Sequence, residues 1–162
     1  MPGVSLDDLR RIDELQVRYL DALDRKNMAA WAGTFAEEAQ YICTTAENED
    51  AGLPLALMMD DCRGRIEDRV KFVEKVWAGT FQDYQTRHFV QRLACTAARA
   101  GLYSVRSNFA VAFTRSDTGE SSILAAGVYD DLVDLSGGQA LFQSKRVVVD
   151  SPVLPHYVVY PL

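Results

Sequence analysis

The sequence predicts an α+β protein in which N-terminal helices pack against a curved, mostly antiparallel sheet. Two observations support this fold class: apolar residues recur at helical spacing in much of the first half, and strand-like alternation fills the second half. With 162 residues, 48% of them hydrophobic, the chain has the size and composition of one globular domain. We therefore expect a single domain over residues 1–162, with a sheet that curls around the helices like a cone.

Two helices are expected first. Ser5 can cap the start of one helix, and Asp8 stands three residues later in a capping-box position. That helical pattern ends near residues 24–27, and a short second helix is predicted over residues 28–35. The apolar faces consist of Leu9, Ile12, Tyr19, Leu20 and Leu23 in the first helix and Met28, Trp31 and Phe35 in the second.

Three further elements precede the long strands. Residues 39–45 are rich in β-formers and predict a short strand, whereas residues 47–55 are acidic, then contain Gly and Pro, and predict a loop. A third helix is expected over residues 59–77, with Gly79 just beyond its end. Its apolar stripe consists of Cys62, Ile66, Val70, Val73 and Trp77.

The second half of the chain predicts an antiparallel meander. Apolar and polar residues alternate most clearly over residues 102–115, as in a strand with one buried face. Turn sequences separate this strand from two others, expected over residues 121–135 and 140–149. A fourth strand is expected before them, over residues 86–97.

The charge of the chain argues against nucleic acid as a partner. The formal net charge is −6, and phosphate binding requires a basic face. A local basic cluster is interleaved with acidic residues, so we interpret it as a solvated helix face with i,i+4 ion pairs. The cluster consists of Arg63, Arg65, Arg69, Lys71 and Lys75.

Hydropathy and cysteine usage predict a soluble, cytoplasmic protein with no membrane partner. The sequence has no run of 18 apolar residues. Its cysteines, Cys43, Cys62 and Cys95, are odd in number and widely spaced, which is not the pattern of a disulfide framework. We expect each cysteine to behave as a small buried hydrophobe.

The sequence also lacks the ligands of a redox centre. A Rieske cluster needs two Cys and two His, in CxH and CxxH pairs, and neither pair occurs. The histidines are His88 and His156, with spacing that does not suggest an iron site. We therefore expect no metal and no cofactor in this chain.

Asp24 and His88 are the candidates for acid–base chemistry. Asp24 lies at the end of the first predicted helix and His88 at the start of a long strand, two places that can meet inside a helix-capped cone. A carboxylate there would orient the imidazole and raise its basicity. The alternative is structural: Asp24 pairs with Arg25 or Arg87, and His88 is a buried, hydrogen-bonded imidazole.

Residues 150–162 combine three prolines, two tyrosines and several aliphatic residues with no acidic or basic side chain after Asp150 apart from His156. One interpretation is a segment docked on its own domain. The other is an apolar arm laid against a neighbouring chain, with Pro155, Tyr157 and Tyr160 as interface candidates.

Five motifs stand in order along the chain: AWAGTFAEEAQY at 30–41, AGLPLALMMDD at 51–61, RIEDRV at 65–70, DYQTRHFVQRL at 83–93 and the closing VVVDSPVLPHYVVYPL. Together they resemble the small (β) subunit of Rieske-type aromatic-ring-hydroxylating dioxygenases, in the branch acting on aromatic acids such as anthranilate, salicylate or terephthalate. The resemblance covers about residues 10–162.

The resemblance implies a cystatin-like (nuclear transport factor two-like) cone and a structural role beside a large (α) oxygenase subunit. That partner would carry the Rieske [2Fe-2S] cluster and the mononuclear iron, receive electrons from NADH through a reductase, and form an α3β3 hexamer with this chain. The same fold class implies a second possibility, a stand-alone dehydratase or isomerase using Asp24 and His88. A small-molecule binding module that uses the cone as a pocket is the third.

Overall fold

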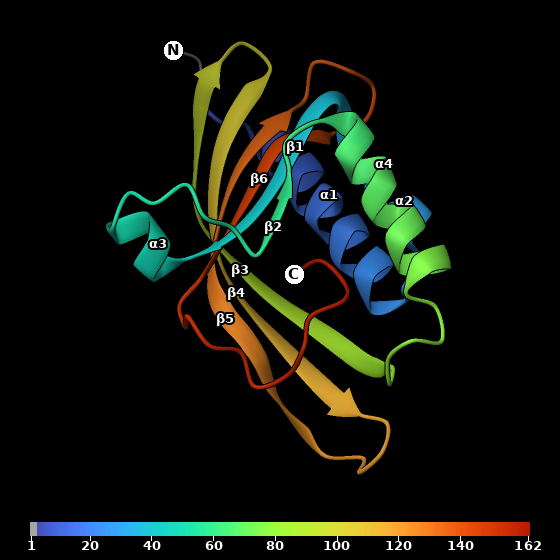
Figure 1. The fold of residues 1–162 in the computed structure, drawn as a ribbon. Helices are drawn as coiled ribbons and strands as arrows, with labels where there is room; N and C mark the ends of the chain where they lie inside the picture. The colour runs from blue at the N-terminus through green and yellow to red at the C-terminus, as the bar shows by residue number, and fades with distance from the viewer. Residues whose placement is uncertain (1–2) are drawn as a thin grey trace.

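The computed structural model describes residues 3–162, so Met1 and Pro2 of the expected domain lie outside it. Figure 1 shows helices α1 (Leu6–Asp24), α2 (Met28–Ala32) and α4 (Arg63–Lys71) on one side of a curved sheet. The sheet has six strands in the order β2-β1-β6-β5-β4-β3. Helices on one face of a mostly antiparallel sheet confirm the predicted α+β class.

The long strands form the predicted meander. Strands β3 (Tyr84–Arg99), β4 (Leu102–Arg115), β5 (Ser121–Asp134) and β6 (Leu141–Val149) pair antiparallel in sequence order. Strand β1 (Phe35–Thr45) then pairs parallel with β6, and β2 (Met58–Asp60) pairs antiparallel with β1. The first-half strands therefore extend the sheet beyond β6, away from β3.

The start of α1 agrees with the sequence. Ser5 Oγ accepts from the backbone N–H of Asp8 at 3.0 Å, and the Asp8 carboxylate accepts from the backbone N–H of Ser5 at 3.0 Å. These reciprocal bonds satisfy two N–H groups that the first helical turn leaves free. The predicted capping box is confirmed.

Two boundaries near the second helix differ from expectation. Helix α2 ends at Ala32 instead of residue 35, because Thr34 Oγ1 donates to the carbonyl oxygen of Trp31 and the chain turns there. Phe35 already begins β1 and lies opposite Phe142 on β6. The predicted loop at 47–55 contains a short helix, α3 (Ala46–Asp50), whose first turn Thr45 caps.

The helix predicted over residues 59–77 was wrong at its start, while its end near Trp77 agrees with the structure. Residues 58–60 form β2, because the backbone of β1 offers hydrogen-bond partners that the helical pattern could not reveal. Helix α4 starts at Arg63, and its last turn widens into a π-helical segment, Phe72–Val76. Gly79 follows with a φ of +74°, as expected of a glycine that ends a helix.

The cysteines and the basic cluster agree only in part with the expectations from the sequence. Cys43 is buried as expected, but Cys62 is exposed because it stands before the first turn of α4, and Cys95 is only partly covered. The basic cluster forms surface ion pairs such as Arg63–Glu67, but Arg69 instead binds the buried carboxylate of Asp60. That ion pair joins α4 to β2.

Between the helices and the sheet lies a core rich in aromatic residues. Tyr19 and Trp31 pack edge-to-face on Phe35, and Tyr19 also meets Phe142. Within residues 3–162, no helix is both long and apolar enough to cross a membrane.

Candidate functional site

Asp24 and His88 meet inside the fold. Asp24 is the last residue of α1, and His88 lies on β3. Nδ1 of His88 is 2.6 Å from Oδ1 of Asp24, and the backbone N–H of His88 donates to Oδ2 at 3.1 Å. Thr86, one inward position earlier on β3, donates its hydroxyl to Oδ1 at 3.0 Å. Strand alternation therefore presents both Thr86 and His88 to the end of α1.

The carboxylate of Asp24 determines which ring nitrogen of His88 carries the proton. Burial alone would raise the pKa of Asp24, but the hydrogen bonds and charge of His88, with the Thr86 hydroxyl, hold that pKa below its ordinary value. An ionised carboxylate only accepts hydrogen bonds, so Nδ1 of His88 carries the proton. The pair has the geometry of an oriented base.

Access to this base is restricted. The His88 side chain is 1% exposed, and its Nε2 is buried without a hydrogen-bond partner within residues 3–162. The neighbouring cavity is lined by Leu20 and Val90, but not by Asp24 or His88. A reacting molecule in that cavity would therefore not touch the imidazole.

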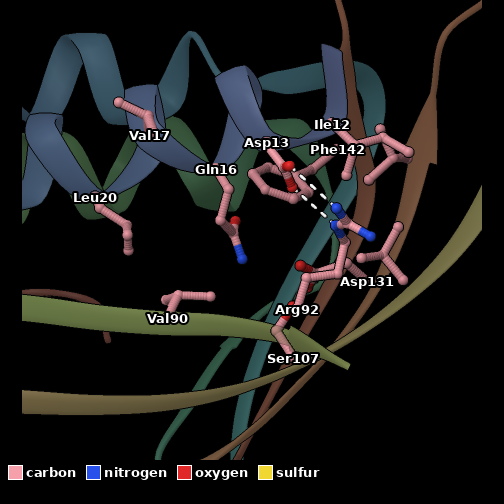
Figure 2. A pocket seen from close by; sticks show the side chains of 12 residues that line it. Ile12, Asp13, Gln16, Val17, Leu20, Val90, Arg92, Ser107, Asp131 and Phe142 are labelled. Carbon is pink, nitrogen blue, oxygen red and sulfur yellow. Dashed lines mark hydrogen bonds and ion pairs between the residues drawn. The ribbon is translucent and has the colours of Figure 1, made fainter. Parts of the chain in front are cut away.

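That cavity lies between α1 and the sheet and has a volume of about 350 Å³. In Figure 2, Gln16 and Leu20 project from α1 toward Val90 on β3. Arg92 on β3 forms a two-point ion pair with Asp13 on α1, at 2.8 and 3.1 Å. The other lining residues are Ile12, Val17, Val105, Ser107, Asp131, Val133 and Phe142.

Asp131, which lines this cavity, belongs to a buried ion pair that the sequence analysis missed. Nζ of Lys145 on β6 donates to Oδ2 of Asp131 on β5 at 2.9 Å, and the two side chains are 0% and 1% exposed. Lys145 also donates to Oε1 of Gln16 at 3.3 Å. Its Nζ lies 3.8 Å from the centre of the Tyr129 ring and 4.4 Å from that of Phe142.

Burial shifts the pKa of both members of the Asp131–Lys145 pair. It raises the pKa of Asp131, which Lys145 opposes only in part, and it lowers the pKa of Lys145. A signal for the pair existed in the sequence: Asp131 and Lys145 each occupy an inward position of an alternating strand, where a charge is costly unless paired.

The residues present do not fit a Rieske cluster or an iron site. Nδ1 of His88 is engaged by Asp24, and Nδ1 of His156 lies 2.8 Å from the carbonyl oxygen of Tyr157. In the part of the chain that the structure describes, no three His, Cys, Asp or Glu side chains are placed to hold a metal ion.

The final segment docks on its own domain at its end. Tyr160 is 8% exposed and donates its hydroxyl to Asp83 at 3.0 Å. The backbone N–H of Leu162 donates to the hydroxyl of Tyr41, and its carbonyl oxygen accepts from Tyr19 at 2.6 Å. Pro155 and Tyr157 are instead exposed, the latter by 47%.

A second exposed apolar surface lies between α3 and β2. Leu53, Leu55 and Leu57, here called the leucine segment, are 48%, 57% and 49% exposed. Its backbone is held to β1: Thr44 donates its hydroxyl to the carbonyl of Leu55, and the N–H of Leu57 donates to Cys43. An ordered backbone with exposed leucines is typical of a protein–protein contact.

Comparisons with known proteins agree on one family. A family model described as the ring hydroxylating beta subunit matches residues 18–156. The chain is 34% identical over 137 residues to the anthranilate 1,2-dioxygenase small subunit of Burkholderia cepacia, covering 85% of this chain and 83% of that one.

Solved structures agree as well. The β subunit of a proposed aromatic-ring-hydroxylating dioxygenase from Novosphingobium aromaticivorans DSM 12444 has a TM-score of 0.81 at 30% identity, covering 92% of this chain and 94% of that one. A protein with a cystatin-like fold from Nostoc punctiforme PCC 73102 has a TM-score of 0.66 at 15% identity, covering 95% and 98%. This second likeness concerns the fold alone, and it confirms the predicted cone.

Proposed function

The chain belongs to the ring hydroxylating beta subunit family, and from this membership we propose that it supports an oxygenase complex without performing the redox chemistry. It is a small subunit of an aromatic-ring-hydroxylating dioxygenase. The observation that carries this conclusion is the family match over residues 18–156, most of the domain. In this family the β subunit pairs with a large α subunit, in which the metal centres lie.

The finer proposal concerns assembly. We propose an α3β3 hexamer in the cytoplasm, with the Rieske [2Fe-2S] cluster and the mononuclear iron both in the α subunits. The ordered, exposed leucine segment supports a partner contact, and so do the exposed Pro155 and Tyr157. Nδ1 of His88 contacts Asp24, and Nδ1 of His156 contacts the carbonyl oxygen of Tyr157. These contacts support placing the metal centres in the α subunit.

Co-expression with the Rieske large subunit of the same organism tests this assembly. The two chains should co-purify in equal amounts, and native mass spectrometry should give the mass of three copies of each. The chain expressed alone should carry no iron–sulfur absorbance. Failure to co-purify would overturn the proposed partner, whereas equal amounts in a different total mass would overturn only the hexamer.

The substrate we propose is an aromatic acid, with anthranilate as the first candidate. Its support is the 34% identity to an anthranilate 1,2-dioxygenase small subunit. The reconstituted complex, supplied with reductase and NADH, should oxidise anthranilate at a kcat/KM at least about tenfold above that for terephthalate. A reversed preference would overturn anthranilate as the proposed substrate and would leave the proposed assembly unaffected.

A second candidate function is favoured by one observation. The 2.6 Å contact between Nδ1 of His88 and Asp24 is the arrangement that an acid–base dehydratase or isomerase would need. The buried Nε2 opposes it, because a base must reach the proton it removes. We therefore place a structural role for this pair ahead of a catalytic one.

A further inference from the structure

We propose that the free edge of β3 is a docking site for an extended segment of another polypeptide, which adds to the sheet as a further strand. The segment carries acidic side chains on one face and apolar side chains on the other. The leucine segment lies beside β1, near the opposite end of the sheet, so the two surfaces are separate. This docking site is therefore distinct from the leucine contact proposed for the large subunit.

The backbone of β3 is unpaired along one side. This strand is the last of the sheet, and among residues 3–162 it pairs with β4 alone. The backbone N–H of His88 donates to Asp24 instead of to β4, so it marks the unpaired side. Backbone groups alternate in direction along a strand, and Val90 and Arg92 therefore turn their N–H and C=O groups to that same side. Asp24 occupies the edge at His88, and the edge continues beyond it from Val90.

This edge is accessible to solvent. Residues 91–94 are all exposed, and Phe89 and Leu93 are exposed by 61% and 50%. Arg92 is exposed as a residue although its side chain alone is only 30% exposed, so its backbone contributes to the accessible surface. The ladder with β4 shifts register between Arg92 and Ala94, which leaves Leu93 unpaired. An added strand therefore meets an accessible backbone flanked by two exposed apolar side chains.

The side of the edge that faces α1 favours apolar residues in the added strand. Figure 2 shows α1 running along β3, with Leu20 above Val90. Both side chains line the cavity under α1, pack against the core and remain only partly buried. A strand added beside β3 places alternate side chains next to them, where apolar groups complete their burial.

The opposite side of the edge favours acidic residues. β3 carries Arg87, Arg92 and Arg99 and no Asp or Glu, in a chain whose net charge is −6. Among residues 3–162, Arg92 is the one of these three that forms an ion pair. Arg87 is exposed and, by strand alternation, faces away from α1. Opposite charges on neighbouring strands attract, so acidic side chains of the added strand belong on this face.

The same charges disfavour a second copy of this chain as the occupant. Its β3 would bring three further arginines and no carboxylate, and like charges on neighbouring strands are destabilising. Charges and a bulge on an edge strand also protect a sheet from pairing with itself. A different polypeptide with alternating acidic and apolar residues avoids the repulsion. Its main-chain hydrogen bonds supply affinity, and its alternate side chains supply specificity.

The experiment is an NMR titration of the full chain with the peptide Ac-VEVEVEVE-NH2 and, separately, with Ac-VKVKVKVK-NH2. The glutamate peptide should shift the amide signals of residues 89–94 in a saturable way, with a Kd below about 1 mM and at least about tenfold below that of the lysine peptide. At saturation, hydrogen exchange of the Val90 and Arg92 amides should slow at least about tenfold, because a paired N–H exchanges only when the pairing opens. No saturable binding, equal affinities or unchanged exchange would overturn the docking site.

Backbone N-methylation of the glutamate peptide tests strand addition itself. The N–H groups of alternate residues point to opposite edges of a strand, so the valine set and the glutamate set face different sides. Methylation of one set should weaken binding at least about tenfold, and methylation of the other should change it less than about threefold. Equal effects of the two sets would contradict pairing along β3.

Two charge reversals localise the site. Arg87→Glu changes an exposed residue of β3 and should weaken binding of the glutamate peptide at least about fivefold. Arg65→Glu makes the same change at an exposed position on α4 and should leave the Kd within about twofold, because charges far apart on the surface are screened. Circular dichroism checks that both variants fold. Equal weakening by the two variants would indicate attraction to the overall charge and would overturn the site.

Discussion

The carboxylate of Asp24 holds His88 at two points, accepting from the backbone N–H at 3.1 Å and from ring Nδ1 at 2.6 Å. Gln85, on the same strand, donates its side-chain amide to the carbonyl oxygen of Asp24 at 2.9 Å. The end of α1 is therefore attached to β3 through both the backbone and the side chain of one residue.

If the Asp24–His88 pair is structural, removing it should lower the stability of the fold and should not change any activity of the isolated chain. We expect His88→Ala to reduce the free energy of unfolding by about 1–3 kcal/mol, because the partly buried Asp24 carboxylate loses its imidazole partner. Urea denaturation measures this. A wild-type chain that alone dehydrates or isomerises a small carbonyl compound, with the activity abolished in His88→Ala, would instead establish the catalytic interpretation.

The lowered pKa of Asp24 makes a prediction about acid stability. A carboxyl group whose pKa is lower in the folded state stabilises the fold above its unfolded pKa, about 3.9, and loses that contribution as pH falls through the folded value. The stability difference between wild type and Asp24→Asn should shrink as the pH falls below about 4. Urea denaturation between pH 3 and pH 5 would show this, and a difference that grows as the pH falls below about 4 would contradict it.

The buried pair Asp131–Lys145 should be intolerant of single changes. Lys145→Met leaves a buried carboxylate without its cation and should cost about 3–5 kcal/mol in unfolding free energy. The double variant Lys145→Met, Asp131→Leu should recover most of that loss. As a control, Arg10→Met removes an exposed ion pair and should cost no more than about 1 kcal/mol. Additive losses in the double variant would show that the two charges act separately.

Truncation after Asp150 should unfold or strongly destabilise the isolated chain. It removes the buried side chains of Val159, Tyr160 and Leu162 and leaves the hydroxyls of Tyr19 and Tyr41 without Leu162. We expect a loss of at least about 3 kcal/mol from the apolar burial alone. Circular dichroism with thermal melting measures it, and a truncated chain that melts like wild type but no longer assembles would show that the segment acts only at an interface.

The leucine segment should matter for assembly and not for folding. Leu55→Glu changes a side chain that is 57% exposed, so the unfolding free energy should stay within about 0.5 kcal/mol of wild type. The yield of co-purified large subunit should fall at least about tenfold. Leu6→Glu, at an 85% exposed position on α1, is the matched control and should assemble normally. Normal assembly of Leu55→Glu would show that the leucine segment is not part of the interface.

Local features were predictable because their partners are near in sequence. The capping box joins residues three apart, and the alternation over residues 102–115 needs only neighbours along one strand. The strand at 58–60 was not predictable in this way, because its backbone partner lies on β1, across α3 and a loop. The helix that the apolar spacing predicted there forms only from Arg63 onward.

Residue order alone was enough to predict the helices and strands, the curved meander, the family resemblance and the shortage of histidine and cysteine pairs for a redox centre. The residues that meet across the fold became known from the folded chain: Asp24 with His88, 64 positions later, and Lys145 with both Asp131 and Gln16. Spacing along the chain encodes local hydrogen bonds and burial patterns. Contacts across elements depend on strand register and on how α1 lies over the sheet.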